Sequence, residues 1–302
     1  MIISDLKKFS ANIKGDIFFD FEIKKFNWFN IGGKAKIFFK PQSPKEIIDF
    51  LKIYSNRGKI FILGAGSNVL FKDNTYQGVI IKLGKNFSNI SILNENIIVA
   101  GGAISQKKTS EYAKDNNIGG LEFMSCIPGS VGGGIRMNSG CFNKEFKDVL
   151  VSVQIVDYEG NLKSIYANKI NFKYRNIDLP KNMIFLSATF RGIKKNKIEI
   201  EKYMHELKYK KELAQPTKVK TGGSTFMNPK DQTDKKVWQL IKESVPKGLK
   251  FGDAKISEKH SNFFINKKDA KYKDMKALID YVKNKVKDRT GVNINLEIKI
   301  AE

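Results

Sequence analysis

The sequence is poor in several residue types, and each scarcity excludes a class of protein. It has only two cysteines among 302 residues, Cys126 and Cys141, so it cannot carry the disulfide framework of a small secreted domain. It has only two histidines, His205 and His260, and the cysteines do not have metal-ligand spacing. We therefore predict reduced thiols and no metal site, and we interpret His205 as structural.

Long apolar runs are also missing. The longest uncharged stretches, such as 60–71, are short and broken by Gly, Ser and Asn, whereas a membrane-spanning helix needs roughly 18 apolar residues. The N-terminus carries an acidic residue, Asp5, and lacks an apolar core followed by a small-residue cleavage site. We therefore expect a cytoplasmic protein without membrane insertion.

Arginine is rare although the chain is strongly basic. Lys and Arg total 54 against 31 Asp and Glu, which gives a net charge of +23. Clustered basic residues would favour nucleic-acid binding, but the lysines are scattered from Lys7 to Lys299, and nucleic-acid readers rely on Arg for bidentate contacts. We interpret the excess as a compositional bias that attracts phosphorylated ligands in general, and we expect no specific nucleic acid partner.

The hydrophobic pattern predicts a mixed α and β protein. A helix is predicted to begin at Ser43, with Pro44 at its first position and Glu46 reaching back in a capping box. Further helices are predicted at 105–116, 199–213, 235–243 and 271–288, and strands at 35–39, 59–63, 79–83, 96–100, within 149–190, at 261–266 and at 292–300. The lysine-rich helix 199–213 marks the best domain boundary. Helix 271–288 places one apolar face toward the core, made of Tyr272, Met275, Leu278, Ile279, Val282 and Val286.

Two glycine-rich segments stand out, "LGAGSNVL" at 63–70 and "IPGSVGGGIRMNSG" at 127–140. The second has the glycine spacing of a P-loop, but Ile135 and Arg136 stand where that motif needs Lys and Ser or Thr. The first begins like a dinucleotide fingerprint, but Val69 occupies the third glycine position. What remains are turns whose bare N–H groups can bind an anion, or, for either segment alone, plain tight turns.

Seven blocks, in order and over nearly the whole chain, resemble the UDP-N-acetylenolpyruvoylglucosamine reductase family, also called UDP-N-acetylmuramate dehydrogenase. They are "FNIGGKA", "LGAGSNVLFKD", "GLEFMSCIPGSVGGGIRMNSG", "FKYR", "QPTKVKTGGSTFMNP", "KISEKHSNFFIN" and "GVNINLEIKI". The resemblance implies an NADPH-dependent flavin reductase that converts UDP-N-acetylenolpyruvoylglucosamine to UDP-N-acetylmuramate in peptidoglycan precursor synthesis and cell wall biogenesis.

The resemblance also implies the fold class and the ligands. The expected fold is α+β, with an FAD-binding domain of the PCMH or vanillyl-alcohol-oxidase type and a C-terminal α+β domain that binds the substrate. The two FAD-binding subdomains would span 1–84 and 85–195, and the C-terminal domain 196–302. The cofactor would be non-covalent FAD, with NADPH as co-substrate and a UDP-sugar as substrate, in a monomeric protein.

Three residues match the catalytic positions of the family. Ser224 would donate a proton to the substrate, while Arg175 and Glu297 would polarise the enolpyruvyl carboxylate, which suits a permanently charged guanidinium and a protonated carboxyl. The positions matched to FAD binding are Gly64, Gly66, Ser67, Asn68, Ile127, Pro128, Gly129, Gly133, Gly134, Asn138 and Gly140. The positions matched to substrate binding are Tyr174, Asn228, His260 and Lys299.

The chain departs from the family pattern in three places. Cys141 and Phe142 stand where Ala-Tyr is common, so a phenol hydroxyl is missing, and Met227 stands where a basic residue is usual. The interval from Arg175 to Ser224 is short, which indicates the compact subtype without an extra tyrosine-bearing loop.

Two other functions remain as alternatives. A carbohydrate oxidase of the same flavin-binding superfamily often links FAD covalently through histidine, and both histidines of this chain lie outside the glycine segments. A basic nucleic-acid-binding protein would need aromatic and Arg residues on one basic face. Outside the family context, Ser224 would be a turn residue, Arg175 a surface charge and Glu297 an exposed strand position.

Overall fold

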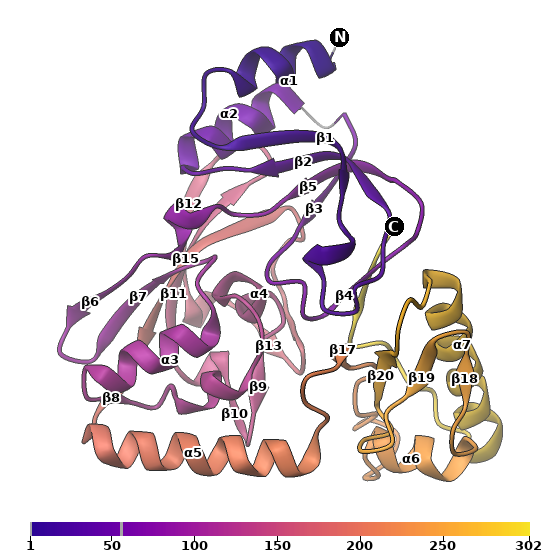
Figure 1. Ribbon diagram of the computed structural model, residues 1–302. Coiled ribbons are helices and arrows are strands. Elements are labelled where there is room, and N and C mark those ends of the chain that lie inside the picture. The colour runs from indigo at the N-terminus through magenta and orange to yellow at the C-terminus, as the bar shows by residue number, and fades with distance from the viewer. Residues whose placement is uncertain (1, 55–56) are drawn as a thin grey trace. The chain divides into compact units, whose positions relative to one another are not determined.

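In the computed structural model, which describes residues 2–54 and 57–302, the chain forms two compact units built from interleaved segments (Figure 1). The first unit holds residues 1–19, 37–65 and 77–210, and the second holds 20–36, 66–76 and 211–302. One boundary therefore falls inside the glycine segment 63–70, between Ala65 and Gly66. The division at 84 and 195 that the sequence predicts stays a prediction.

The N-terminal part of the chain forms a four-stranded sheet in the order β1-β2-β5-β3. It contains β1 (Asp16–Glu22), β2 (Lys34–Lys40), β3 (Lys59–Ile62) and β5 (Tyr76–Ile81), and β3 pairs with β5 in parallel. In the first unit, α1 (Ile2–Ser10) and α2 (Pro44–Tyr54) pack on one face of this sheet through a core that includes Phe39, Phe50 and Ile81. The rings of Phe39 and Phe50 stack with centroids 4.4 Å apart, so aromatic packing fixes α2 on the sheet.

The start of α2 confirms the predicted helix and corrects its cap. Ser43 Oγ accepts the N–H of Glu46 at 3.2 Å, as an N-cap should. The Glu46 carboxylate does not take the N–H of Ser43; it accepts the N–H groups of Gln42 at 2.7 Å and of Lys14 at 3.0 Å. The predicted capping box is therefore wrong in its second half, because Glu46 serves two segments outside the helix.

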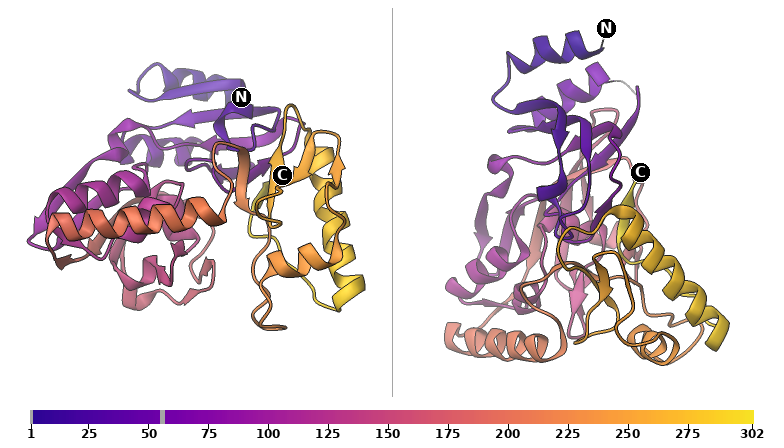
Figure 2. Two further views of the ribbon diagram at one scale, coloured as in Figure 1. Left: turned by 60° about the horizontal axis from the view of Figure 1, so that its bottom comes forward. Right: turned by 45° about the vertical axis from the view of Figure 1, so that its right-hand side comes forward.

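A five-stranded antiparallel sheet in the order β12-β11-β15-β7-β6 forms the rest of the first unit. Its strands are β6 (Ile90–Asn94), β7 (Ile97–Gly101), β11 (Leu150–Asp157), β12 (Leu162–Tyr166) and β15 (Met183–Arg191). The helices of this part are α3 (Gln106–Asp115), α4 (Val131–Arg136) and the first part of α5 (Lys197–Ala214). Helices α3 and α5 lie side by side, joined by the ion pair of Asp115 with Lys197 at 2.8 Å (Figure 2).

Short elements complete the first unit and shape its glycine segments. Three two-stranded pairs are formed by β8 (Ile118–Gly119) with β16 (Ile193–Lys194), β9 (Gly140–Cys141) with β10 (Lys144–Glu145), and β13 (Phe172–Lys173) with β14 (Asn176–Ile177). Single 3₁₀ turns are η2 (Lys85–Ser88), η3 (Glu122–Cys126), η4 (Phe146–Asp148) and η5 (Ala167–Lys169), and η1 (Lys24–Phe26) lies in the second unit. The β9–β10 and β13–β14 hairpins carry predicted site residues.

The second unit is built around a sheet in the order β17-β20-β19-β18. Its strands are β17 (Lys220–Ser224), β18 (Lys250–Phe251), β19 (Ala254–Ile256) and β20 (Phe263–Asn266), and its helices are α6 (Val237–Ser244) and α7 (Tyr272–Thr290). The predicted apolar face of α7 is confirmed, since Met275, Leu278, Ile279, Val282 and Val286 are buried and Tyr272 packs against the same core.

The last strand of the sequence is shorter than predicted. Within 292–300 only the end joins a strand, β21 (Lys299–Ala301), which pairs in parallel with β4 (Val69–Phe71). The preceding residues alternate between buried and exposed, as Val292 and Asn293 do, which is the pattern of a strand. That segment makes a single bridge, from Leu296 to Phe226, and the predicted strand is therefore wrong over most of its length.

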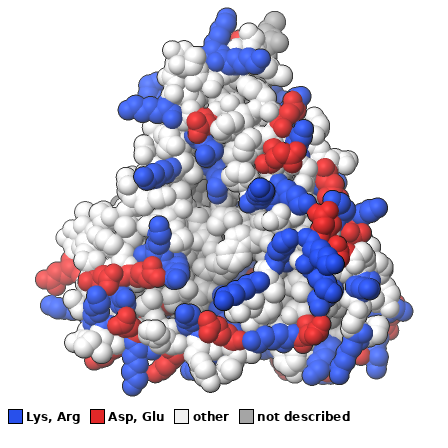
Figure 3. Space-filling view, viewed as in Figure 1, with Lys and Arg blue, Asp and Glu red and all other residues white. Residues whose placement is uncertain are grey.

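The surface carries both charge signs. On the face seen in Figure 3, Lys and Arg side chains are interspersed with Asp and Glu. This mixture agrees with a compositional lysine bias over that face. Within residues 2–54 and 57–302, no helix combines the length and the apolar character needed to cross a bilayer.

Candidate functional site

The glycine segment 127–140 folds as a turn, the short helix α4 and the start of the β9–β10 hairpin. Ser130 is the N-cap of α4, and its Oγ accepts the N–H of Gly133 at 3.3 Å. Gly129 precedes this cap with φ of 146°, in the region that L side chains rarely adopt. The local sequence therefore sets a sharp entry into the helix.

Several glycines predicted to bind the flavin are required by packing within the protein itself. A Cβ on Gly134 would lie 2.4 Å from Phe146 Cζ, and one on Gly140 would lie 2.3 Å from the Lys144 carbonyl oxygen. Both distances are too short for real atoms, so packing in the first unit alone demands glycine there. The same holds in the second unit for Gly66, where a Cβ would lie 2.1 Å from the Phe26 carbonyl oxygen.

At Gly133, packing within the protein does not require a glycine. It is exposed, and the nearest atom to an added Cβ is Ser130 Oγ at 3.4 Å, an ordinary contact distance. Gly64 lies next to it, because a Cβ on Gly64 would meet Ser130 Oγ at 2.6 Å and Gly133 Cα at 3.9 Å. The two glycine segments therefore meet in the first unit and leave a bare backbone surface at Gly133, where a bound group can approach closely.

Arg175 occupies the tip of the β13–β14 hairpin. Its backbone has φ of 56°, which is uncommon for a residue with a side chain. Its Nη2 donates to the Gly140 carbonyl at 3.0 Å, its Nη1 lies 4.0 Å from Glu145 Oε1, and its guanidinium lies 5.0 Å from the centre of the Tyr174 ring. The hairpin thus holds a half-buried guanidinium directly beside the end of the glycine segment.

Asn138 is committed to holding this arrangement together. It is fully buried, its Nδ2 donates to Glu145 Oε2 at 3.0 Å and to the Lys173 carbonyl at 3.2 Å, and its Oδ1 accepts the N–H of Lys147 at 3.1 Å. The predicted contact of Asn138 with FAD stays a prediction. Its side chain is buried and already makes three hydrogen bonds within the protein. Glu145, which the sequence did not single out, links Asn138 to Arg175; a lone acidic residue among lysines gave no motif.

Ser224 and Glu297 lie on adjacent segments of the second unit. Ser224 ends β17 at an irregularity in its pairing with β20, and the N–H of Glu297 donates to the carbonyl of the next residue, Thr225, at 2.9 Å. Both side chains are partly exposed. Gly223, just before Ser224, has φ of 79° and has no atom within 4 Å of an added Cβ, so the backbone beside the serine is open.

Asn68 joins this pair from the other glycine segment. Its Nδ2 donates to the Glu297 carbonyl at 3.1 Å, and its own carbonyl accepts the N–H of Lys299 at 2.9 Å. Three predicted residues that are distant in sequence therefore come together. Asn68 contacts the segment from Glu297 to Lys299 through its side-chain amide and its backbone carbonyl. Its predicted FAD contact is not tested by this geometry.

Asn228 and His260 both lie near the start of α6 in the second unit, His260 with its ring centre 6.2 Å from that of Trp238. Asn228 Oδ1 accepts the N–H of Val237 at 3.0 Å and so caps α6, while His260 Nδ1 accepts the N–H of Asn262 at 3.2 Å. Burial lowers the pKa of His260 below its ordinary value, although its backbone hydrogen bond opposes the shift, so the imidazole is neutral at neutral pH. Because Nδ1 accepts this bond, the neutral imidazole carries its proton on Nε2, which is left to donate a hydrogen bond.

Two of the three departures from the family pattern can be located in the structure. Phe142 and Asn143 form the two-residue loop of the β9–β10 hairpin with φ of 51° and 61°, the conformation of a type I′ turn. The Phe142 ring is partly exposed. In the second unit, the N–H of Met227 donates to the Asn295 carbonyl at 2.8 Å, so its backbone continues the pairing beside Glu297.

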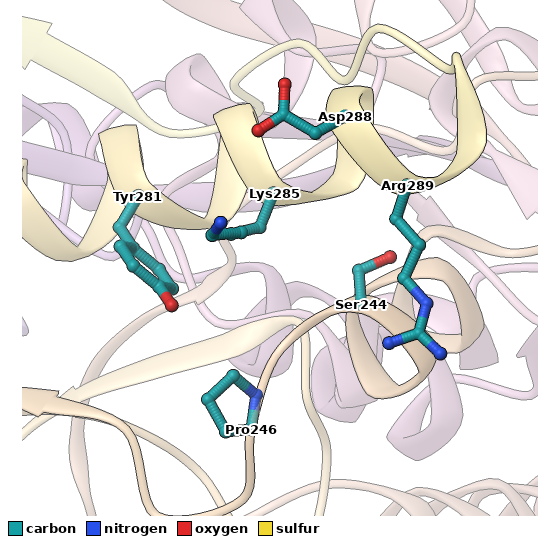
Figure 4. A pocket seen from close by; sticks show the side chains of 6 residues that line it. All are labelled: Ser244, Pro246, Tyr281, Lys285, Asp288 and Arg289. Atoms are coloured by element: carbon teal, nitrogen blue, oxygen red, sulfur yellow. The ribbon is translucent and has the colours of Figure 1, made fainter.

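A pocket of about 410 Å³ lies elsewhere in the second unit, between the end of α6 and the last turns of α7 (Figure 4). It is lined by Ser244, Pro246, Tyr281, Lys285, Asp288 and Arg289. None of these is a predicted site residue. The predicted site residues therefore lie on turns and hairpins outside this pocket.

Two family models match separate parts of the chain. Residues 35–166 match the model of an FAD-binding domain family, and residues 215–301 match the C-terminal domain of UDP-N-acetylenolpyruvoylglucosamine reductase. The first range contains both glycine segments, and the second contains Ser224, His260 and Glu297.

Full-length relatives carry one name. The chain is 57% identical over 300 residues to the UDP-N-acetylenolpyruvoylglucosamine reductase of Pelagibacter ubique, covering 99% of each chain. It is 40% identical to that of Rickettsia bellii, over 95% of this chain and 94% of the relative. The crystal structure of the reductase from Thermus caldophilus superposes with a TM-score of 0.81 at 26% identity, over 96% of this chain and all of that one.

Proposed function

The chain belongs to the UDP-N-acetylenolpyruvoylglucosamine reductase family, and we propose that it carries out the family reaction with NADPH as reductant and Ser224 as proton donor. It is an FAD-dependent oxidoreductase that reduces UDP-N-acetylenolpyruvoylglucosamine in peptidoglycan synthesis. The expected α+β fold, with an FAD-binding part and a C-terminal reductase domain, is confirmed.

The residues of the first unit fit a bound flavin nucleotide. The observation that supports this fit is the bare backbone at Gly133, where packing within the protein does not require a glycine. Ser130 and Gly64 fix that backbone from two sides. When bound, FAD supplies hydride transfer between NADPH and the double bond. Ile127, Pro128 and Gly129 of this unit are proposed to contact it, as the family resemblance implies, and so is Ser67, which belongs to the second unit.

The residues of the second unit fit the proton and charge requirements of the reduction. Adding hydride and a proton across an enolpyruvyl double bond needs an acid for one carbon and stabilisation for charge that develops toward the carboxylate. The adjacency of Ser224 and Glu297 through the Thr225 carbonyl is the observation that carries this proposal. Ser224 would donate the proton, and Glu297, as a hydrogen-bond donor in its protonated form, would stabilise the carboxylate.

Arg175 is proposed to share that task. Its guanidinium is already restrained by Gly140 and Glu145, so little conformational freedom is lost when it meets an oxyanion. Tyr174, Asn228, His260 and Lys299 are proposed to bind the nucleotide sugar. Asn228 would do so while it caps α6, and His260 as a neutral imidazole.

We also propose that the flavin is held without a covalent bond through histidine. The segment that matches the FAD-binding family, 35–166, contains neither His205 nor His260. A monomer working in the cytoplasm, where NADPH and the UDP-sugar would be supplied, completes the proposal. Gel filtration of the native protein tests the oligomeric state.

One experiment tests the function as a whole. The purified protein should be yellow, should release its flavin on denaturation, and should oxidise more than one equivalent of NADPH per flavin only when UDP-N-acetylenolpyruvoylglucosamine is present. The product should be the lactyl ether, UDP-N-acetylmuramate. A protein that takes up no flavin from added FAD, or that turns over many equivalents of NADPH without consuming the enolpyruvyl ether, would contradict the proposal.

A further inference from the structure

Lys82 places a positive charge under the junction of the two glycine segments. It directly follows β5, and its Nζ donates to the Gly64 carbonyl at 2.5 Å. Gly64 is the residue that contacts Ser130 and approaches Gly133, so the ammonium lies one residue from the bare backbone surface described above. No sequence motif singles out Lys82, since it is one lysine among many.

The strand pattern places Lys82 on the face away from α1 and α2. Val79 and Ile81 point into the core beneath those helices, and successive side chains of a strand point to opposite faces. Pairing continues through this position, because the N–H of Lys82 donates to the Phe39 carbonyl at 2.9 Å. The Lys82 side chain therefore extends from the face of the sheet opposite α1 and α2, where it reaches the Gly64 carbonyl.

The charge of Lys82 is only partly compensated. Within the described residues its ammonium contacts a neutral carbonyl and is not paired with a carboxylate. Burial, followed by the neighbouring positive charge of Lys40, lowers the pKa of Lys82. A half-buried ammonium beside a second cation is an unfavourable arrangement, and an anion bound nearby would relieve it.

We propose that Lys82 is a positioning residue that holds the Gly64 turn and supplies the positive charge for the diphosphate of FAD. This inference rests on the proposed function, because it takes FAD as the anion. One N–H of the ammonium fixes the carbonyl of the turn, and the charge attracts the phosphates that the bare N–H groups of the turns receive. The diphosphate is favoured over the flavin ring because glycine turns bind phosphate through backbone N–H groups.

The test compares Lys82→Met, Lys82→Arg and the control Lys85→Met, which removes the same charge from an exposed site three residues later. FAD is removed, and the affinity of each apoprotein for added FAD is measured by flavin fluorescence. Lys82→Met should bind FAD about ten- to a hundredfold more weakly, as expected for the loss of a charge-assisted contact. Lys82→Arg should lose only a few-fold, and Lys85→Met about twofold or less.

Salt and redox measurements separate electrostatic action from support of the turn alone. The affinity gap between wild type and Lys82→Met should shrink between about 0.01 and about 1 M salt, over which the screening length falls from roughly 30 to 3 Å. The midpoint potential of the bound flavin should stay unchanged. A gap that is independent of salt, a shifted potential, or an unchanged FAD affinity would each overturn the inference. Failure of the wild-type protein to bind FAD would instead overturn the proposed function.

Discussion

Asn68 Nδ2 donates a hydrogen bond to the backbone carbonyl of Glu297 at 3.1 Å, although the two residues are 229 positions apart in the sequence. The same asparagine accepts the N–H of Lys299 through its own carbonyl. A glycine segment that the sequence assigned to FAD therefore also positions the segment that carries Glu297.

Asn68→Ala should lower turnover by about tenfold, because misplacing a catalytic group by a fraction of an ångström is costly. The rate of flavin reduction by NADPH should change little. Asn96→Ala is the matched control, since Asn96 Nδ2 also donates to a backbone carbonyl, that of Gly192, at 3.1 Å. Equal losses of activity in the two variants would show that Asn68 acts only on stability.

Gly133→Val should abolish FAD binding without unfolding the protein. An added Cβ meets only Ser130 Oγ at 3.4 Å, so the apoprotein has room for it, and we expect FAD affinity to fall by at least about 100-fold because a branched side chain occupies the bare surface. Gly134→Val should instead destabilise the apoprotein strongly, since its Cβ would lie 2.4 Å from Phe146. Thermal unfolding of both apoproteins and FAD titration separate the two effects. Full flavin occupancy in Gly133→Val would contradict the assignment of the surface at Gly133 to FAD binding.

Much of this arrangement could be predicted from the sequence, and the reasons differ by residue. The helix at Pro44 and the apolar face of α7 follow from local capping and from a 3.6-residue period, which depend on neighbouring residues alone. The ordered family blocks predict Ser224, Arg175 and Glu297 as catalytic residues, and these roles stay predictions. The strand 292–300 was overpredicted because alternating burial also occurs in an extended segment that lacks a partner strand for most of its length.

Other features depend on contacts that no local pattern encodes. Glu145 positions Arg175, and Lys82 supports Gly64, only because the fold brings separate hairpins and strands together. Gly134 and Gly140 read in the sequence like cofactor glycines, but Phe146 and the Lys144 carbonyl already exclude side chains there. A sequence shows that a side chain is missing, and the packing shows which neighbour requires it.

Phe142→Asn should stabilise the protein. Phe142 has φ of 51° in a type I′ turn, a conformation that costs an ordinary residue about 1 kcal/mol and that Asn tolerates. We expect the free energy of unfolding to rise by about that amount in urea denaturation of the apoprotein. Phe142→Leu keeps the backbone cost and should bring no gain. A destabilised Asn variant would show that contacts of the Phe142 ring outweigh its backbone cost.

Asp157→Asn should lower stability at neutral pH by about 1–2 kcal/mol, as expected when charge-assisted hydrogen bonds are lost. Burial would raise the pKa of Asp157, but hydrogen bonds from Lys163 and from the backbone and side chain of Asn161 outweigh it and lower the pKa from 3.8 to about 2. A carboxyl group whose pKa is lowered by folding stabilises the folded protein at pH values above its unfolded-state pKa. That stabilisation is lost as the pH falls toward the folded-state pKa.

The pH dependence gives the corresponding check. Between pH of about 4 and about 2, wild type should lose more stability than Asp157→Asn, so the two curves should converge. Asp234→Asn, at an exposed carboxylate, is the control and should leave the gap to wild type constant. Parallel curves for wild type and Asp157→Asn over this range would contradict the assigned pKa.

The central claim is that Ser224 donates the proton to the substrate, and stopped-flow absorbance of the flavin in Ser224→Ala tests it most directly. Reduction of the flavin by NADPH needs no proton from this serine and should proceed at a near-normal rate. Reoxidation by UDP-N-acetylenolpyruvoylglucosamine should slow by about 10²–10⁴-fold, the usual effect of losing a positioned acid, and Ser224→Cys should recover part of that loss. Equal slowing of both half-reactions, or no slowing of reoxidation, would contradict the account and leave Ser224 as the structural end of β17.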